Sequence, residues 1–288
     1  MSTTSRIRHS FVGKAARRII HYVYHLQHPA GQPVTYRLPA GVSIDLYPEG
    51  EIAEFLAVQR LFEKTELALV GAYLKPGMKV VDVGANIGLY SIFCEKLAGQ
   101  TGTVWAFEPS GESFGRLRKN LALNRCERVR PIQIALSDKS DVFLTLKSDP
   151  GFGDAYRYLA TSPEASTKNG GDIESVEVTT LDAWAAKNGL IELDFLKVDV
   201  EGGEYGVFRG AREIIRASRN LAILFESDPG WCDRAGCSQQ DTFGLLKSIG
   251  LGLYGWNGKS KQWMTDDRSL LESDMVWACF DRSRLPVL

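Results

Sequence analysis

Histidine is missing from most of this chain: all four histidines lie within the first 28 of its 288 residues. The rest of the chain therefore has no imidazole for proton transfer and must use a carboxylate, lysine, tyrosine or cysteine instead. The same absence excludes a histidine-ligated metal site from that part of the chain. We expect acidic side chains to carry any acid–base chemistry there.

Long apolar runs are also missing, and cysteine is scarce. No apolar stretch approaches the roughly 20 residues of a membrane-spanning helix. The five cysteines are odd in number and scattered. Cys94 and Cys279 lie in apolar patterns typical of a core, whereas Cys232 and Cys237 have no second ligand pair nearby, so we expect no metal site. A reducing, cytoplasmic setting fits this use of cysteine.

Acidic residues are absent from residues 1–44, which contain six lysines and arginines. The remaining residues carry 28 basic and 35 acidic groups, a net charge of −7. Binding to nucleic acid requires the neutralisation of phosphates, for which this acidic body is a poor match. We therefore expect no nucleic-acid partner.

The basic segment 5–26 has apolar residues at helical spacing, which predicts an amphipathic helix. Three interpretations stay open. The helix packs on the body of the protein, it rests peripherally on an anionic membrane surface, or it is an organelle transit peptide.

Two further elements complete an N-terminal extension over residues 1–75. Residues 33–48 alternate around Pro39-Ala40-Gly41, which predicts a hairpin, and residues 51–74 have a helical pattern. From residue 76 onward, strands alternate with helices. This order is typical of an α/β domain, here 76–288, whose mostly parallel sheet has helices on both faces.

Within that domain, strands are expected at residues 80–83, 104–108, 132–135, 194–200 and 221–226, followed by a late antiparallel pair at 252–256 and 274–280. Helices are expected at 89–97, 114–121, 207–215 and 240–249. Residues 141–146 and 173–180 alternate as if paired antiparallel. The polar insertion 147–172 between them contains Tyr156, Arg157 and Tyr158, which could stack on or hydrogen-bond a substrate ring as part of a lid.

The first two strands of the domain carry the most specific signal. The strand at 80–83 leads into a turn containing Gly84 and Gly88, and the next strand ends at Glu108. A strand, a glycine turn, a helix start and an acid after the next strand form a site for a nucleoside cofactor, with the acid accepting from ribose hydroxyls.

Two cofactors fit this pattern. NAD needs close backbone approach to a pyrophosphate through a Gly-x-Gly-x-x-Gly turn, but Asn86 occupies the middle glycine position. S-adenosylmethionine has no phosphates and needs only a small-residue loop with polar groups. The loop from Asp82 to Gly88 therefore favours S-adenosylmethionine.

Acidic residues also follow the later strands. Lys197, Asp199 and Glu201 have the same parity, so one strand face is expected to carry all three, and Glu226 ends the next strand. In one interpretation, these residues have a structural role alone, as salt bridges and helix caps. Alternatively, Asp199 or Glu201 removes a proton from a substrate hydroxyl. Near the third strand, Asp138, after Ser137, is either an acceptor for an adenine amino group or an ordinary turn residue.

The chain also resembles the FkbM-type methyltransferases over roughly residues 60–230. The Lys-x-Asp-x-Glu-Gly segment at 197–202 is the most specific match, and Gly203 departs from the alanine more common in the family. The matching segments are 81–88, 106–109, 135–138, 180–182, 196–202, 208–211 and 224–226.

This resemblance implies a class I methyltransferase fold, Rossmann-like with a seven-stranded sheet, and methylation of a hydroxyl on a saccharide or other natural product. It implies that Glu108 holds the ribose and Asp138 the adenine of the cofactor, while Lys197 orients the acids. The remaining implied residues are Gly84, Ala85, Asn86 and Gly88 at the methionine part, and Asp199, Glu201 and Glu226 at the transfer site.

Two rival functions stay open. The first is an NAD-linked oxidoreductase, which Asn86 and the lack of a histidine or Tyr-x-x-x-Lys pair for hydride chemistry disfavour. The second is a non-catalytic module that keeps the cofactor pocket, which the presence of Asp199, Glu201 and Glu226 disfavours.

Overall fold

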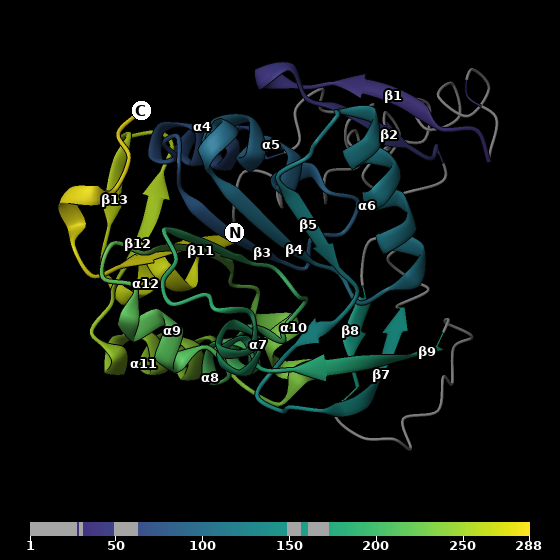
Figure 1. Ribbon diagram of the computed structural model, residues 1–288. Coiled ribbons are helices and arrows are strands. Elements are labelled where there is room, and N and C mark those ends of the chain that lie inside the picture. Colours follow the sequence, from purple (N-terminus) through teal and green to yellow (C-terminus); the bar gives the residue numbers. More distant parts are fainter. Residues whose placement is uncertain (1–27, 29–30, 49–62, 149–156, 161–172) are drawn as a thin grey trace, which may run out of the picture.

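The computed structural model describes residues 28, 31–48, 63–148, 157–160 and 173–288 (Figure 1). The predicted basic helix at 5–26 and most of the predicted helix at 51–74 lie outside these ranges. Within them, no helix is both long and apolar enough to cross a membrane.

An eight-stranded mixed sheet forms the centre of the domain, in the order β13-β12-β14-β11-β10-β3-β4-β5. The five strands from β11 to β5 are parallel, and β14, β12 and β13 are antiparallel. Their bounds are β3 Lys79–Val83, β4 Thr103–Phe107, β5 Val129–Ile132, β10 Phe195–Val198, β11 Ala222–Glu226, β12 Gly252–Asn257, β13 Gln262–Met264 and β14 Met275–Cys279. The predicted α/β class and the late antiparallel pair are confirmed.

The sheet has one strand more than the seven that the resemblance implies. The extra strand is β13, which pairs with β12 across a short polar turn. Trp263 in β13 packs on Trp256 with ring centroids 5.0 Å apart, and its indole N–H donates to the carbonyl of Pro286 at 2.8 Å. These contacts hold a strand of only three residues on the edge of the sheet.

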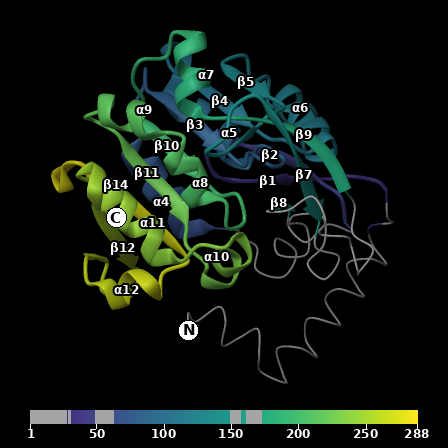
Figure 2. The ribbon, with the colours of Figure 1, turned by 90° about the horizontal axis from the view of Figure 1, so that it is seen from below.

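Helices cover both faces of the sheet (Figures 1 and 2). Because side chains alternate along a strand, Val80 faces one core and Val81 the other. The first core includes residues of α4 Lys64–Tyr73, α5 Leu89–Ala98 and α6 Gly111–Leu123. The second includes residues of α7 Leu181–Asn188, α8 Glu204–Arg209, α9 Arg212–Ala217, α11 Gln239–Ile249 and α12 Asp267–Leu271.

Several helices begin and end at residues suited to capping. Ser238 and Asp241 form a capping box at the start of α11, which ends at Gly250 in the left-handed conformation. Ser110 accepts from the backbone N–H of Ser113 at the start of α6. The predictions of helices near 89–97, 114–121 and 240–249 are confirmed.

The single helix predicted at 207–215 is wrong, because α8 and α9 are separate. They meet at Gly210, where an added Cβ atom would lie 2.1 Å from the backbone oxygen of Ser137. The chain therefore passes directly against the segment that follows β6 (Ala135–Leu136), and this close approach interrupts the helix. A similar correction applies to the strand expected at 132–135. It is divided between β5 in the main sheet and β6 in a second sheet.

The second sheet has four strands in the order β6-β9-β7-β8. β7 Val142–Ser148 and β9 Ile173–Thr179 are antiparallel, as predicted. The insertion expected at 147–172 is not wholly a loop, because β8 Arg157–Leu159 pairs with the end of β7. The predicted residue Tyr156 lies outside the described residues.

The predicted hairpin is confirmed, with β1 Val34–Arg37 antiparallel to β2 Ser43–Leu46. Helix α6 holds it through two asparagines. The Asn120 side chain accepts from the backbone N–H of Asp45 at 2.9 Å, and that of Asn124 accepts from Ser43 at 2.8 Å. The inward residues of β2 are buried in the first core, so the hairpin packs against the α/β domain.

Candidate functional site

A cavity of about 560 Å³ lies at the carboxyl ends of the parallel strands. Its size suits a small-molecule ligand. The turn after β3, the end of β4, the turn after β10 and the end of β11 line it, together with the second sheet and the hairpin. In an open α/β sheet, ligands bind at this edge.

The turn after β3 lies unusually close to the neighbouring strand. Gly84 has φ +76°, and an added Cβ atom would lie 1.9 Å from the backbone oxygen of Asp199. The N–H groups of Gly84 and Ala85 both donate to the carbonyl of Phe107. Asn86 follows with φ +49° and lines the cavity. The turn thus presents a small, closely packed backbone surface to a ligand.

Glu108 is held rigidly beside this turn. Its Oε2 accepts from the N–H of Asn86 at 2.8 Å and its Oε1 from the N–H of Ser110 at 2.9 Å. Burial raises the pKa of Glu108 to about 7, although both N–H donors act in the opposite direction. The carboxylate retains acceptor capacity toward the cavity, which suits ribose hydroxyls.

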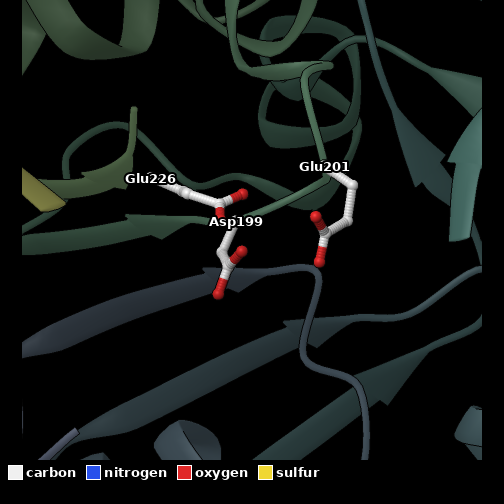
Figure 3. A group of neighbouring side chains, drawn as sticks. All are labelled: Asp199, Glu201 and Glu226. Atoms are coloured by element: carbon white, nitrogen blue, oxygen red, sulfur yellow. The ribbon is translucent and has the colours of Figure 1, made fainter. Parts of the chain in front are cut away.

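Asp199, Glu201 and Glu226 also line the cavity and lie close together at the ends of β10 and β11 (Figure 3). One carboxylate oxygen of each lies within 4.8 Å of the other two. The expectation that strand parity brings Lys197, Asp199 and Glu201 together is wrong for Glu201. Strand β10 ends at Val198, and Glu201 has φ +55°, so a turn places it beside Asp199.

The acids in this cluster differ in their electrostatics. Burial and the charge of Asp199 raise the pKa of Glu201 to about 10. The same two causes raise the pKa of Glu226 well above its usual value. The Oε2 atoms of Glu201 and Glu226 are buried without a hydrogen-bond partner. Burial and the charge of Asp199 therefore favour the protonated forms of Glu201 and Glu226.

Lys197 is the cation of this corner. Its Nζ lies 3.0 Å from Asp199 Oδ2, 3.8 Å from Asp82 Oδ1 and 4.7 Å from the centre of the Tyr90 ring. Burial opposes its charge, but Asp199, Asp82 and Glu63 outweigh that effect and raise the pKa of Lys197. It is a buried ammonium group that orients Asp199.

Two of the predicted cofactor residues do not line the cavity. Asp82 is fully buried, and its Oδ2 accepts from the Ser91 hydroxyl at 2.6 Å. Gly88 lies behind the turn, where an added Cβ atom would be 2.6 Å from Leu117 Cδ1. In this structure, Asp82 forms an ion pair with Lys197, and Gly88 allows the turn to pack on α6.

The remaining predicted residues lie on the wall formed by the second sheet and α8. Ser137 and Asp138 line the cavity, and Asp138 Oδ2 pairs with Arg209 at 3.0 Å. Arg157 pairs with Glu112 at 2.7 Å. The ring of Tyr158 lies 6.5 Å from that of Trp231, measured between centroids.

Three residues of the site were missed by reasoning from the sequence. Glu63 and Tyr90 line the cavity and are hydrogen-bonded to each other. Glu204 is buried and accepts from the N–H groups of Val200 and Gly202, so it fixes the turn that carries Glu201. Tyr90 could have been predicted as a site residue, because it directly follows the glycine turn. Glu63 could not, because only tertiary packing brings it to the site.

The three converging carboxylates form an arrangement that could hold a metal ion. Lys197 already supplies a positive charge 3.0 Å from Asp199, which competes with such an ion. The prediction that no metal is bound stays a prediction.

Residues 82–249 match the family described as Methyltransferase FkbM domain. This chain belongs to the FkbM methyltransferase family. Members of this family use S-adenosylmethionine, so this chain is an S-adenosylmethionine-dependent methyltransferase. Its central sheet, with five parallel strands and helices on both faces, has the class I, Rossmann-like architecture. The predicted family, cofactor and fold class are confirmed, and the family does not support the NAD alternative.

Two curated relatives have names that specify an oxygen position. The chain is 31% identical over 205 residues to 31-O-demethyl-FK506 methyltransferase FkbM of Streptomyces tacrolimicus, covering 62% of this chain and 76% of the relative. It is 27% identical over 179 residues to 2-O-methyltransferase NoeI of Sinorhizobium fredii, covering 59% of this chain and 72% of that protein. The crystal structure of methyltransferase FkbM from Methylobacillus flagellatus KT is 17% identical with a TM-score of 0.41, covering 70% of this chain and 43% of that chain.

The cavity fits the cofactor. The small residues Gly84 and Ala85, the polar residue Asn86 and the Glu108 carboxylate line the same cavity, as a cofactor with an amino-acid end and a ribose requires. Its volume suits a nucleoside joined to an amino acid and a small acceptor.

Proposed function

We propose that this protein transfers a methyl group from S-adenosylmethionine to a hydroxyl oxygen of a saccharide or another small natural product. The observation that carries this proposal is the corner formed by Lys197, Asp199, Glu201 and Glu226 at one end of the cavity. An O-methyltransferase needs an acceptor for the hydroxyl proton, and this corner provides one. The names of the two relatives, which specify methylation at oxygen, support the same choice.

The residues that line the cavity suggest which part of the cofactor each would hold. Gly84, Ala85 and Asn86 would hold the methionine part, and Glu108 would accept from the ribose hydroxyls. Ser137 and Asp138 also line the cavity and would meet the adenine. With the nucleoside placed there, the methyl group would face Asp199 and Glu201, which lie in the turn after β10 against which Gly84 packs.

Bound S-adenosylmethionine supplies an electrophilic methyl group, whose bond to sulfur breaks as the bond to the acceptor oxygen forms. Asp199 would take the proton released by the hydroxyl, because Lys197 pairs with it, whereas burial and the charge of Asp199 favour the protonated forms of Glu201 and Glu226. Glu201 and Glu226 would then act as hydrogen-bond donors that orient the acceptor. Positioning of two reactants can contribute about 7–11 kcal/mol, and general base catalysis about 10²–10⁴-fold.

The acceptor would enter along the second sheet. Arg157 and Tyr158 line the cavity on β8, and Tyr158 lies near Trp231. A planar guanidinium group and aromatic rings suit the hydroxyls and apolar faces of a sugar.

The test uses S-adenosylmethionine that carries a trideuterated methyl group. The purified protein is incubated with this cofactor and with fractionated glycans and metabolites of a cell extract, and mass spectrometry follows products that gain the labelled methyl group. We expect the label in an alkali-stable ether on oxygen. Label only on nitrogen, carbon or sulfur, or no label at all, would refute the proposal.

A further inference from the structure

Glu63 occupies an unusual position at the edge of the cavity. It precedes the first residue of α4 and has φ 48° and ψ 42°, a left-handed conformation that is unfavourable for a residue with a side chain. Its side chain makes no capping hydrogen bond to α4. Instead, the carboxylate accepts from the hydroxyl of Tyr90, which lies in the first turn of α5.

The surroundings of Glu63 indicate that its carboxylate can pair with a cation. Burial and the nearby charge of Asp199 disfavour its ionised form and raise its pKa to about 7, and Lys197 only partly offsets them. Lys197 is already engaged by Asp199 and Asp82. A second positive charge in the cavity would stabilise the ionised carboxylate of Glu63.

The amino-acid end of S-adenosylmethionine carries such a charge. Its methionine part has an α-ammonium group and a carboxylate. The start of α5, directly after Gly88, has no side-chain cap and offers the positive end of a helix dipole to the carboxylate. Asp82, the acid of the glycine turn, is buried against Ser91 and Lys197 and does not reach the cavity. Glu63 is the carboxylate on the cavity wall beside Tyr90.

We propose that Glu63, positioned by Tyr90, binds the α-ammonium group of S-adenosylmethionine. The two ends of the methionine part would then be held by different elements, the carboxylate by α5 and the ammonium by the residue before α4. This inference rests on the cofactor orientation proposed above, in which the turn after β3 holds the methionine part.

Two ligands that differ only at this end of the cofactor test the proposal. S-adenosylhomocysteine keeps the ammonium group, and 5′-methylthioadenosine lacks the whole amino-acid end. We expect Glu63→Gln to weaken binding of S-adenosylhomocysteine about tenfold or more, measured by isothermal titration calorimetry, because a charge-assisted hydrogen bond is lost. Binding of 5′-methylthioadenosine should not change.

Two further variants make the experiment decisive. Tyr90→Phe removes the hydroxyl that orients Glu63, so it should weaken S-adenosylhomocysteine selectively but less strongly. Glu213→Gln makes the same substitution at an exposed ion pair with Arg216 on α9, outside the cavity, and should change neither affinity. Equal weakening of both ligands by Glu63→Gln would show a merely structural role and overturn the proposal. An unchanged affinity for S-adenosylhomocysteine would also overturn it, and methyl transfer by the unsubstituted protein would then still support the proposed function.

Discussion

The ammonium group of Lys197 lies 3.0 Å from the carboxylate of Asp199, immediately beyond the end of β10. This contact distinguishes Asp199 from its two acidic neighbours. Glu201 and Glu226 have raised pKa values and buried oxygens without partners. The corner therefore contains one acid paired with a cation and two acids whose protonated forms are favoured by burial.

Replacement of Asp199 by asparagine tests its role as the base. We expect Asp199→Asn to lower the rate of methyl transfer at saturating cofactor by about 10²–10⁴-fold, since the amide cannot accept the hydroxyl proton. Initial rates with labelled cofactor and calorimetric binding of S-adenosylhomocysteine provide the two measurements. The matched control is Asp267→Asn at an exposed ion pair with Lys247, which should leave the rate unchanged. Full turnover by Asp199→Asn would remove Asp199 from the mechanism.

Replacement of Lys197 by methionine tests the buried ion pairs. Its side chain is only 5% exposed, and Asp82, one of its partners, is 1% exposed. We expect Lys197→Met to lower the free energy of unfolding by about 3–5 kcal/mol, because the buried carboxyl group of Asp82 loses its cation. Urea unfolding at pH 7 measures this change in the free energy of unfolding. Adding Asp82→Asn should restore part of the loss, and an equally unstable double variant would contradict the explanation.

Glu108 should make nucleoside binding depend on pH. Burial raises its pKa to about 7 in the empty protein, whereas ribose hydroxyls donate to the ionised carboxylate. Affinity should therefore rise as the pH increases from about 6 to 8, through that pKa. The ligand to use is 5′-methylthioadenosine, because it lacks the amino-acid end proposed to meet Glu63. Glu108→Gln should bind it more weakly and without this pH dependence. The same pH dependence in that variant would assign the titration to another group.

Removal of metal ions should have little effect on activity. Although Asp199, Glu201 and Glu226 could hold an ion, the Lys197 ammonium group already lies against Asp199. We expect protein dialysed against a chelator to retain its rate of methyl transfer. A loss of activity that added Mg²⁺ restores would contradict this expectation and would make the three carboxylates the first residues to test as ligands.

Much of the site could be predicted because its signals are local in the sequence. The strand before Gly84, the acid at Glu108 and the segment from Lys197 to Glu201 each combine an apolar strand with a turn or a charge. The parallel order of the strands then brings these segments to one edge of the sheet.

What could not be predicted depends on contacts between distant segments. The break between α8 and α9 comes from the contact of Gly210 with the Ser137 backbone. Asp82 looked like a cavity residue, but Ser91 and Lys197 enclose it. Glu63 reaches the cavity because Tyr90 donates to it, and no local pattern marks that pairing.

Two glycine substitutions should have opposite effects and thereby test how tightly the cofactor turn is packed. In Gly84→Ala, the new Cβ atom would lie 1.9 Å from the backbone oxygen of Asp199, at φ +76°. We expect a loss of stability and of S-adenosylhomocysteine binding, because either the turn or Asp199 must move. In Gly115→Ala, within α6, the Cβ atom has no atom within 4 Å. That change should raise the free energy of unfolding by about 0.5–1 kcal/mol and leave binding unchanged, since alanine favours a helix over glycine. Urea unfolding and calorimetry on both variants measure these effects. If Gly84→Ala behaved like Gly115→Ala, the turn would not be the closely packed surface on which the proposed position of the cofactor depends.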